Sequence, residues 1–147
     1  MSTAASLATL LQIDSDINFY TLQMTHFQNL HKRTTEEVAA YQKKEEIYNK
    51  AYDKAFNLDD GKTLEVNGVT ITGGNVTEEM AHMYAALKTD IDYTQLEIDL
   101  EEVSSWDTYY ECEESTNNAV LEQLRAQKQN VQQLVSTNAQ DTHQSGS

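Results

Sequence analysis

The stretch Leu64–Gly74, LEVNGVTITGG, decides the fold and lies near the middle of a 147-residue chain. Apolar and polar residues alternate on both sides of Asn67-Gly68, and both residues of a two-residue hairpin turn must tolerate positive φ. The pattern predicts a β-hairpin over about 62–73 with one apolar face. The residues that define this tip hairpin are Leu64, Val66, Asn67, Gly68, Val69 and Ile71.

The segment before the hairpin has the pattern of one long helix. The chain contains no proline, which would break a helix interior. Apolar residues recur every 3.5 residues over about 3–58, which is typical of a coiled-coil seam. The seam positions are Leu10, Ile13, Ile17, Tyr20, Met24, Phe27, His31, Thr34, Val38, Tyr41, Glu45, Tyr48, Tyr52 and Ala55.

The segment after the hairpin predicts a second long helix, over about 76–135. Asn75 and Glu78 have the spacing of a capping box, which indicates a helix start. An early apolar stripe and a later one differ in register, so we expect a register shift near 96–103. The early stripe is Leu87, Ile91 and Ile98, and the later one is Leu96, Leu100, Val103, Tyr110, Leu121, Leu124, Val131 and Val135. The polar residues 136–147 predict a flexible tail.

These elements predict a mainly all-α fold in a single domain, 1–147. The two helices are nearly equal in length and flank a tight connector, which favours a long antiparallel two-helix hairpin, similar to a coiled coil, with the β-hairpin at its tip. If the chain turns at Asn67-Gly68, basic residues of the first helix face acidic residues of the second. That register places Phe27 near Trp106 and Leu10 near Leu124.

Several large apolar residues lie outside the predicted seam, and two helices alone cannot cover them. Exposed apolar patches usually mark association sites. We therefore expect self-association as a homo-oligomer or filament. The predicted oligomer interface comprises Leu7, Leu11, Phe19, Leu22, Leu30, Trp106, Tyr109, Val120 and Leu134.

Two interpretations of the hairpin stay open. Its apolar face could cap the helix ends by packing on Phe56, Leu58, Met80 and Met83. Its strand edges could instead pair with another protein, because an isolated two-stranded hairpin is marginal in water.

Composition disfavours several classes of function. The net charge of −14 argues against nucleic acid and anionic membranes as partners, and no run approaches the roughly 20 apolar residues of a membrane span. Nucleotide-binding, zinc-protease and serine-hydrolase motifs are absent from the sequence. Glu79 and His82 have the spacing of a di-iron ligand pair, but an exposed pair is the simpler interpretation. We expect no cofactor, no metal and no enzymatic activity.

The expected function is that of a structural, self-assembling subunit. In layout and in its acidic, Ser/Thr/Asn/Gln-rich composition, the chain resembles flagellin-like and needle-like filament subunits. The alternative is a chaperone, because two helices joined by a β-hairpin also resemble a β-type prefoldin subunit, which holds clients at its helix tips. The start of the chain lacks the basic residues of a secretory signal. A cleaved signal peptide is therefore not expected. The resemblance to secreted filament subunits implies extracellular assembly after export without such a signal, with the cytoplasm as the alternative.

Overall fold

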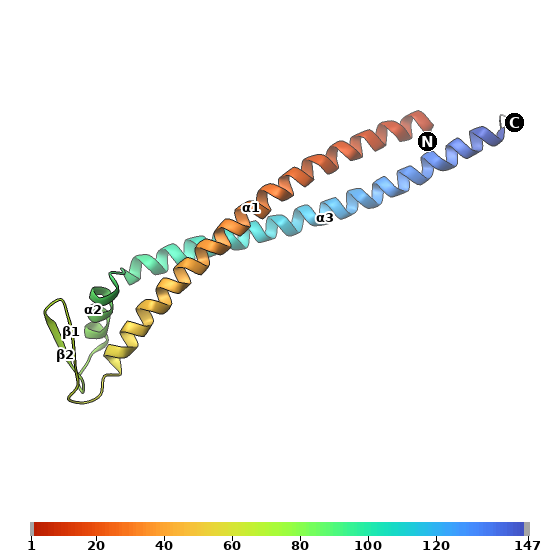
Figure 1. Cartoon of the computed structure of the whole chain (residues 1–147). Helices are drawn as coiled ribbons and strands as arrows, with labels where there is room; N and C mark the ends of the chain where they lie inside the picture. Colours follow the sequence, from red (N-terminus) through yellow and green to blue (C-terminus); the bar gives the residue numbers. More distant parts are fainter. Residues whose placement is uncertain (1, 146–147) are drawn as a thin grey trace. The chain divides into compact units, whose positions relative to one another are not determined.

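The computed structural model describes the backbone of residues 2–145 and the side chains of residues 2–139. The elements along the chain are α1 (Thr3–Phe56), β1 (Thr63–Val66), β2 (Val69–Thr72), α2 (Glu78–Thr89) and α3 (Tyr93–Ser145) (Figure 1). The chain divides into two compact units, which are described separately below. The first joins residues up to Lys32 with those from Thr108 onward, and the second is Arg33–Asp107.

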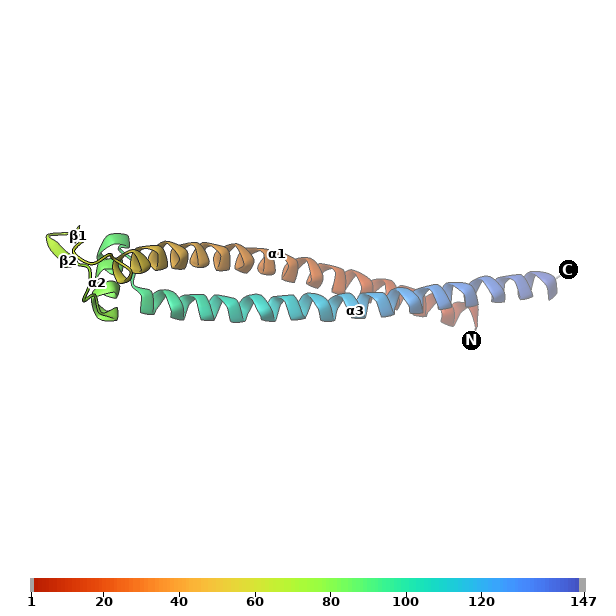
Figure 2. The ribbon, with the colours of Figure 1, turned by 90° about the horizontal axis from the view of Figure 1, so that it is seen from below.

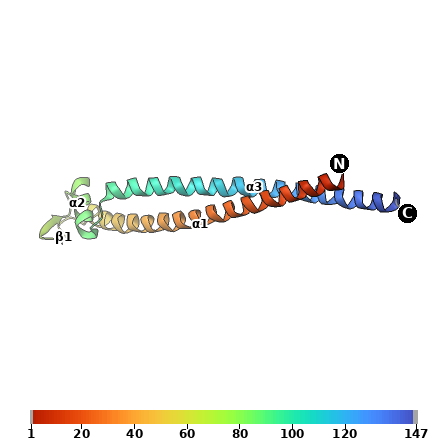
Figure 3. The same cartoon turned by 90° about the horizontal axis from the view of Figure 1, so that it is seen from above.

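The antiparallel pair of long helices is confirmed: α1 and α3 pack side by side in opposite directions (Figures 1 and 3). Every seam position that the sequence predicts in α1 is buried or half-buried, including the polar residues His31, Thr34 and Glu45. Within each unit, the 3.5-residue period therefore turns one face of α1 inward.

In the first unit, the seam combines apolar packing with polar pairs. Ile13 and Leu121 are buried, and the ring of Phe27 lies 6.5 Å from that of Tyr109 and 6.2 Å from that of Tyr110. Lys128 Nζ pairs with Asp14 Oδ1 at 2.7 Å, and His31 Nδ1 lies 3.0 Å from Glu114 Oε1.

These contacts correct the predicted facing register. Phe27 meets Tyr109 and Tyr110, about one turn beyond the predicted Trp106. Because Asp14 pairs with Lys128, Leu10 lies level with residues beyond 128 and about two turns from the predicted Leu124. The predicted register assumed a chain reversal at Asn67-Gly68 and an unbroken second helix, whereas α2 ends at Thr89 and α3 begins at Tyr93.

The second long helix is interrupted, in contrast to the prediction of one helix over 76–135. Asp90 takes a left-handed conformation (φ 56°, ψ 34°) and ends α2 through its N–H, which bonds to the Ala86 carbonyl. Asp92 starts α3, because its carboxylate accepts the Gln95 N–H at 3.2 Å. This break replaces the expected register shift within the helix.

Both ends of the predicted second helix also differ in the structure. The N-cap of α2 is Thr77, whose side chain accepts the Met80 N–H, so the prediction that Asn75 caps the helix is wrong. At the other end, α3 continues through Ser145 instead of ending near 135. The last two residues of the predicted flexible tail, 146 and 147, lie outside the described residues.

The predicted β-hairpin is confirmed in position and turn. Its strands pair antiparallel from Thr63↔Thr72 to Val66↔Val69. Asn67 and Gly68 both have positive φ, 48° and 80°, as a two-residue turn of this kind requires. The base is closed by the Gly73 N–H, which donates to the Lys62 carbonyl at 2.8 Å.

The hairpin covers the core of the second unit. The hairpin lies beside α2 and the end of α1 (Figure 2). Val66 and Ile71 are buried in one cluster with residues from these two helices. Leu58 and Met80 pack against this cluster as the capping interpretation expects, whereas Phe56 and Met83 remain exposed. The buried members of the cluster are Tyr48, Ala51, Ala55, Val66, Ile71, Ala81, Tyr84 and Ala85.

The hairpin turn provides a test of this arrangement. We expect Gly68→Val to disorder the hairpin, because a β-branched residue at φ 80° is strained by roughly 1–3 kcal/mol. Gly68→Asn is the matched control, since Asn tolerates the left-handed region. Amide hydrogen exchange at Val66–Ile71 should accelerate in the Val variant only, while circular dichroism keeps most of the helical signal. If the amides of Val66–Ile71 stayed protected from exchange in the Val variant, the assigned Asn67-Gly68 turn would be contradicted.

Candidate functional site

The outer face of α1 in the first unit exposes four large apolar side chains. Leu11 and Leu22 are each 73% exposed, Phe19 is 60% exposed and Leu7 is 48% exposed. Leu11 and Leu22 are eleven residues apart, which is close to three helical turns, so they share one line along the helix. We call these four residues the α1 outer face.

The α1 outer face is also free of charge. Between Thr3 and His31 the charged residues are Asp14 and Asp16, and both are half-buried. Asp14 pairs with Lys128 of α3, and Asp16 accepts a hydrogen bond from Gln12. An uncharged apolar strip is unusual on a surface whose chain carries a net charge of −14.

The other residues of the predicted interface divide into two groups. Trp106, Tyr109 and Leu134 are 46–49% exposed, and Trp106 belongs to the second unit. Leu30 and Val120 are half-buried. The α1 outer face is therefore the part of the predicted set that forms one exposed strip.

Sequence reasoning missed a second group of exposed apolar residues. Ile47, Phe56, Met83, Leu87 and Ile98 are 39–53% exposed, and all belong to the second unit. Leu87 and Ile98 belong to the early apolar stripe that the sequence predicts for the second helix. The break at 90–92 removes that stripe from the seam, because α3 starts anew at Tyr93.

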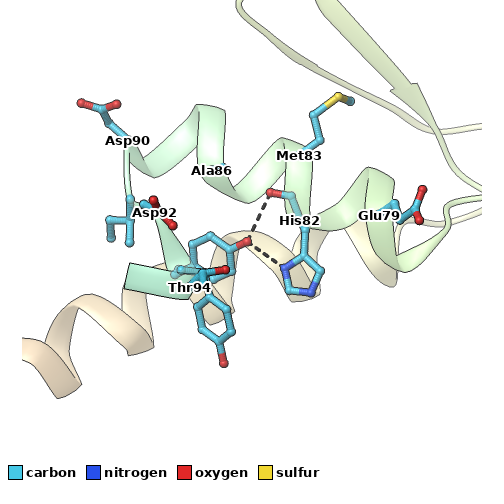
Figure 4. A pocket seen from close by; sticks show the side chains of 10 residues that line it. Glu79, His82, Met83, Ala86, Asp90, Asp92 and Thr94 are labelled. Carbon is cyan, nitrogen blue, oxygen red and sulfur yellow. Dashed lines mark hydrogen bonds between the residues drawn. The ribbon is translucent and has the colours of Figure 1, made fainter. Parts of the chain in front are cut away.

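The second unit has a hollow of about 730 Å³ beside α2 and the first turn of α3 (Figure 4). Tyrosines and a histidine form part of its wall, and three carboxylates belong to its lining. Lysine and arginine are absent from the lining, which is composed of Tyr48, Glu79, His82, Met83, Ala86, Asp90, Ile91, Asp92, Tyr93 and Thr94.

Tyr48 organises the aromatic wall of the hollow. Its hydroxyl donates to the His82 carbonyl at 3.2 Å and lies 2.7 Å from His82 Nδ1 (dashed lines in Figure 4). Its ring stacks on that of Tyr93 at 4.6 Å, and the ring of Tyr52 lies 4.6 Å from that of His82. The wall is therefore held by both hydrogen bonds and ring contacts.

The tyrosines of this wall are held in their neutral form. A hydrogen bond to the Glu97 carboxylate, assisted by burial, raises the pKa of Tyr93 to about 12. Burial, followed by the neighbouring Tyr52 and Asp92, raises the pKa of Tyr48. The hydroxyl groups of Tyr48 and Tyr93 are therefore hydrogen-bond donors at neutral pH, and neither is poised to act as a base.

The di-iron spacing of Glu79 and His82 gains no third ligand. Both residues line the hollow, but within the described part of the chain no three His, Cys, Asp or Glu side chains come close enough to hold a metal ion.

Cys112 is exposed and forms no disulfide bond. None of the described helices combines the length and apolarity that crossing a membrane needs.

The chain matches no protein-family model, no curated protein and no solved structure. The α1 outer face and the hollow of the second unit are therefore the features that bear on its function. The many exposed apolar side chains indicate a protein interface.

The pKa of Tyr93 gives a direct test of the hollow's wall. Because the folded-state pKa of about 12 exceeds the ordinary value of 10, its contribution to stability is complete below pH 10 and is lost as pH rises through 12. Nuclear magnetic resonance of labelled tyrosine Cζ should show one tyrosine that titrates near pH 12 and disappears in Tyr93→Phe. In Glu97→Gln that titration should move toward 10. An unmoved titration in Glu97→Gln would contradict the assigned hydrogen bond.

Proposed function

We propose that this protein is a non-enzymatic structural subunit that associates with copies of itself through the α1 outer face. The observation that carries the proposal is the strip of Leu7, Leu11, Phe19 and Leu22, which is exposed and uncharged. Burying each of the larger side chains would contribute roughly 1.5–3 kcal/mol. Their exposure is a cost that association removes.

A second copy is the partner that fits this strip most simply. Each copy carries a net charge of −14, so two copies repel unless they approach through surfaces without charge. The α1 outer face is such a surface, and an isologous contact would place the same strip on both sides. Bundles of more than two helices commonly bury such faces.

The same exposed face favours one alternative, a prefoldin-like chaperone that holds unfolded clients. Such a protein would also present apolar helix surface to its partner. The two functions differ in a measurable way: a chaperone would suppress the aggregation of an unfolded protein such as reduced insulin, whereas a structural subunit would assemble without a client. Light scattering of insulin during reduction separates them.

The assembly proposal predicts the behaviour of one double variant. We expect Phe19→Asp with Leu22→Asp to weaken self-association at least about a hundredfold, because it removes two apolar side chains that the proposed assembly would bury and adds two like charges. Sedimentation velocity should show a smaller species than the wild type at the same concentration. Circular dichroism should be unchanged, since both side chains are exposed.

The control is Ile47→Asp, which places one such charge on an exposed apolar position of α1 in the second unit. This variant should assemble like the wild type. A wild-type protein that sediments as a single chain at every concentration would overturn the proposal. So would equal loss of assembly in the control and the double variant.

A further inference from the structure

The hollow of the second unit has a composition that selects for positive charge. Its lining includes Glu79, Asp90 and Asp92 and no lysine or arginine. At about 730 Å³ it lies within the usual range of ligand sites, roughly 300–1,000 Å³. We propose that this hollow binds an arginine side chain of a partner protein at the end where Asp90 and Asp92 lie.

The two aspartates at this end are fixed in place by the helix break. Asp90 is held in the left-handed conformation that ends α2, and Asp92 is held as the N-cap of α3. A carboxylate has about four acceptor positions, so Asp92 can bond the Gln95 N–H and still accept from a ligand. Glu79 lies in the first turn of α2, at the opposite end of the hollow (Figure 4).

At this end of the hollow, carboxylate groups outnumber the nearby basic groups. Lys44 lines a neighbouring hollow together with Asp90, Asp92 and Asp99, so a single ammonium group faces three carboxylates there. Among the described residues, neither Asp90 nor Asp92 forms an ion pair within 4.0 Å. An incoming cation would therefore meet uncompensated negative charge.

The remainder of the lining favours arginine over a bare inorganic cation. Ile91, Met83 and Ala86 provide apolar surface for the methylene part of a side chain. The exposed ring of His82 and the half-buried ring of Tyr93 provide flat surfaces on which a guanidinium can stack. Arginine combines this stacking with paired hydrogen bonds to carboxylates, which lysine does not.

The experiment uses the full chain and a short peptide, acetyl-Gly-Arg-Gly, that carries a neutral fluorophore. Fluorescence anisotropy should show saturable binding of this peptide. The same peptide with citrulline in place of arginine has nearly the same shape without the charge, and it should bind at least about tenfold more weakly. Equal binding of the two peptides would overturn the proposal.

A double variant locates the binding at the two aspartates. Asp90→Asn with Asp92→Asn removes two charges and keeps the fold, because Asn tolerates the left-handed conformation and is a good N-cap. We expect this variant to bind the arginine peptide about tenfold more weakly, because it loses two partly exposed charge pairs with the guanidinium group. Circular dichroism checks that the helices remain.

The control for net charge is Glu101→Gln with Glu102→Gln, an equal loss of charge on exposed positions of α3 outside the hollow. This variant should bind the arginine peptide like the wild type. If both double variants lose binding equally, the peptide responds to overall charge and the proposed site is wrong. Absence of saturable binding to the wild type would also overturn it.

Discussion

The heptad contact between α1 and α3 is the interaction from which the other features follow. A 3.5-residue period turns one face of each helix inward over many turns. The remaining apolar residues of α1 must then point outward, and Leu11 and Leu22 do so. The exposed strip is therefore a consequence of the seam and not a packing defect.

Two polar residues of the α1 seam, His31 and Thr34, meet polar partners on α3. Asp107 accepts hydrogen bonds from Thr34 at 2.7 Å and from Thr35 at 2.8 Å in the second unit, and His31 meets Glu114 in the first. A polar group inside a coiled coil is costly unless its partner lies opposite. Displacing the helices by one heptad, about 10 Å, would separate these pairs, so they favour one register.

The sequence was sufficient to predict the features that depend on local pattern. Asn67-Gly68 predicted the hairpin because few residues accept positive φ at both turn positions, and the heptad predicted the seam of α1. The break at 90–92 was missed, although Asp92 and Gln95 have the spacing of a capping box. The hollow could not be predicted, because it forms only when α2 ends at Asp90 and α3 starts again at Tyr93.

The most direct test of the account measures a distance within the first unit. Spin labels at Gln12→Cys and Asn130→Cys, in a Cys112→Ser background diluted with unlabelled chain, lie beside the Asp14–Lys128 pair. With helix axes roughly 8–10 Å apart, pulsed electron resonance should give one narrow distribution of short distances. A distribution longer by several helical turns of about 5.4 Å each would contradict the antiparallel seam, and with it the outward placement of the α1 outer face.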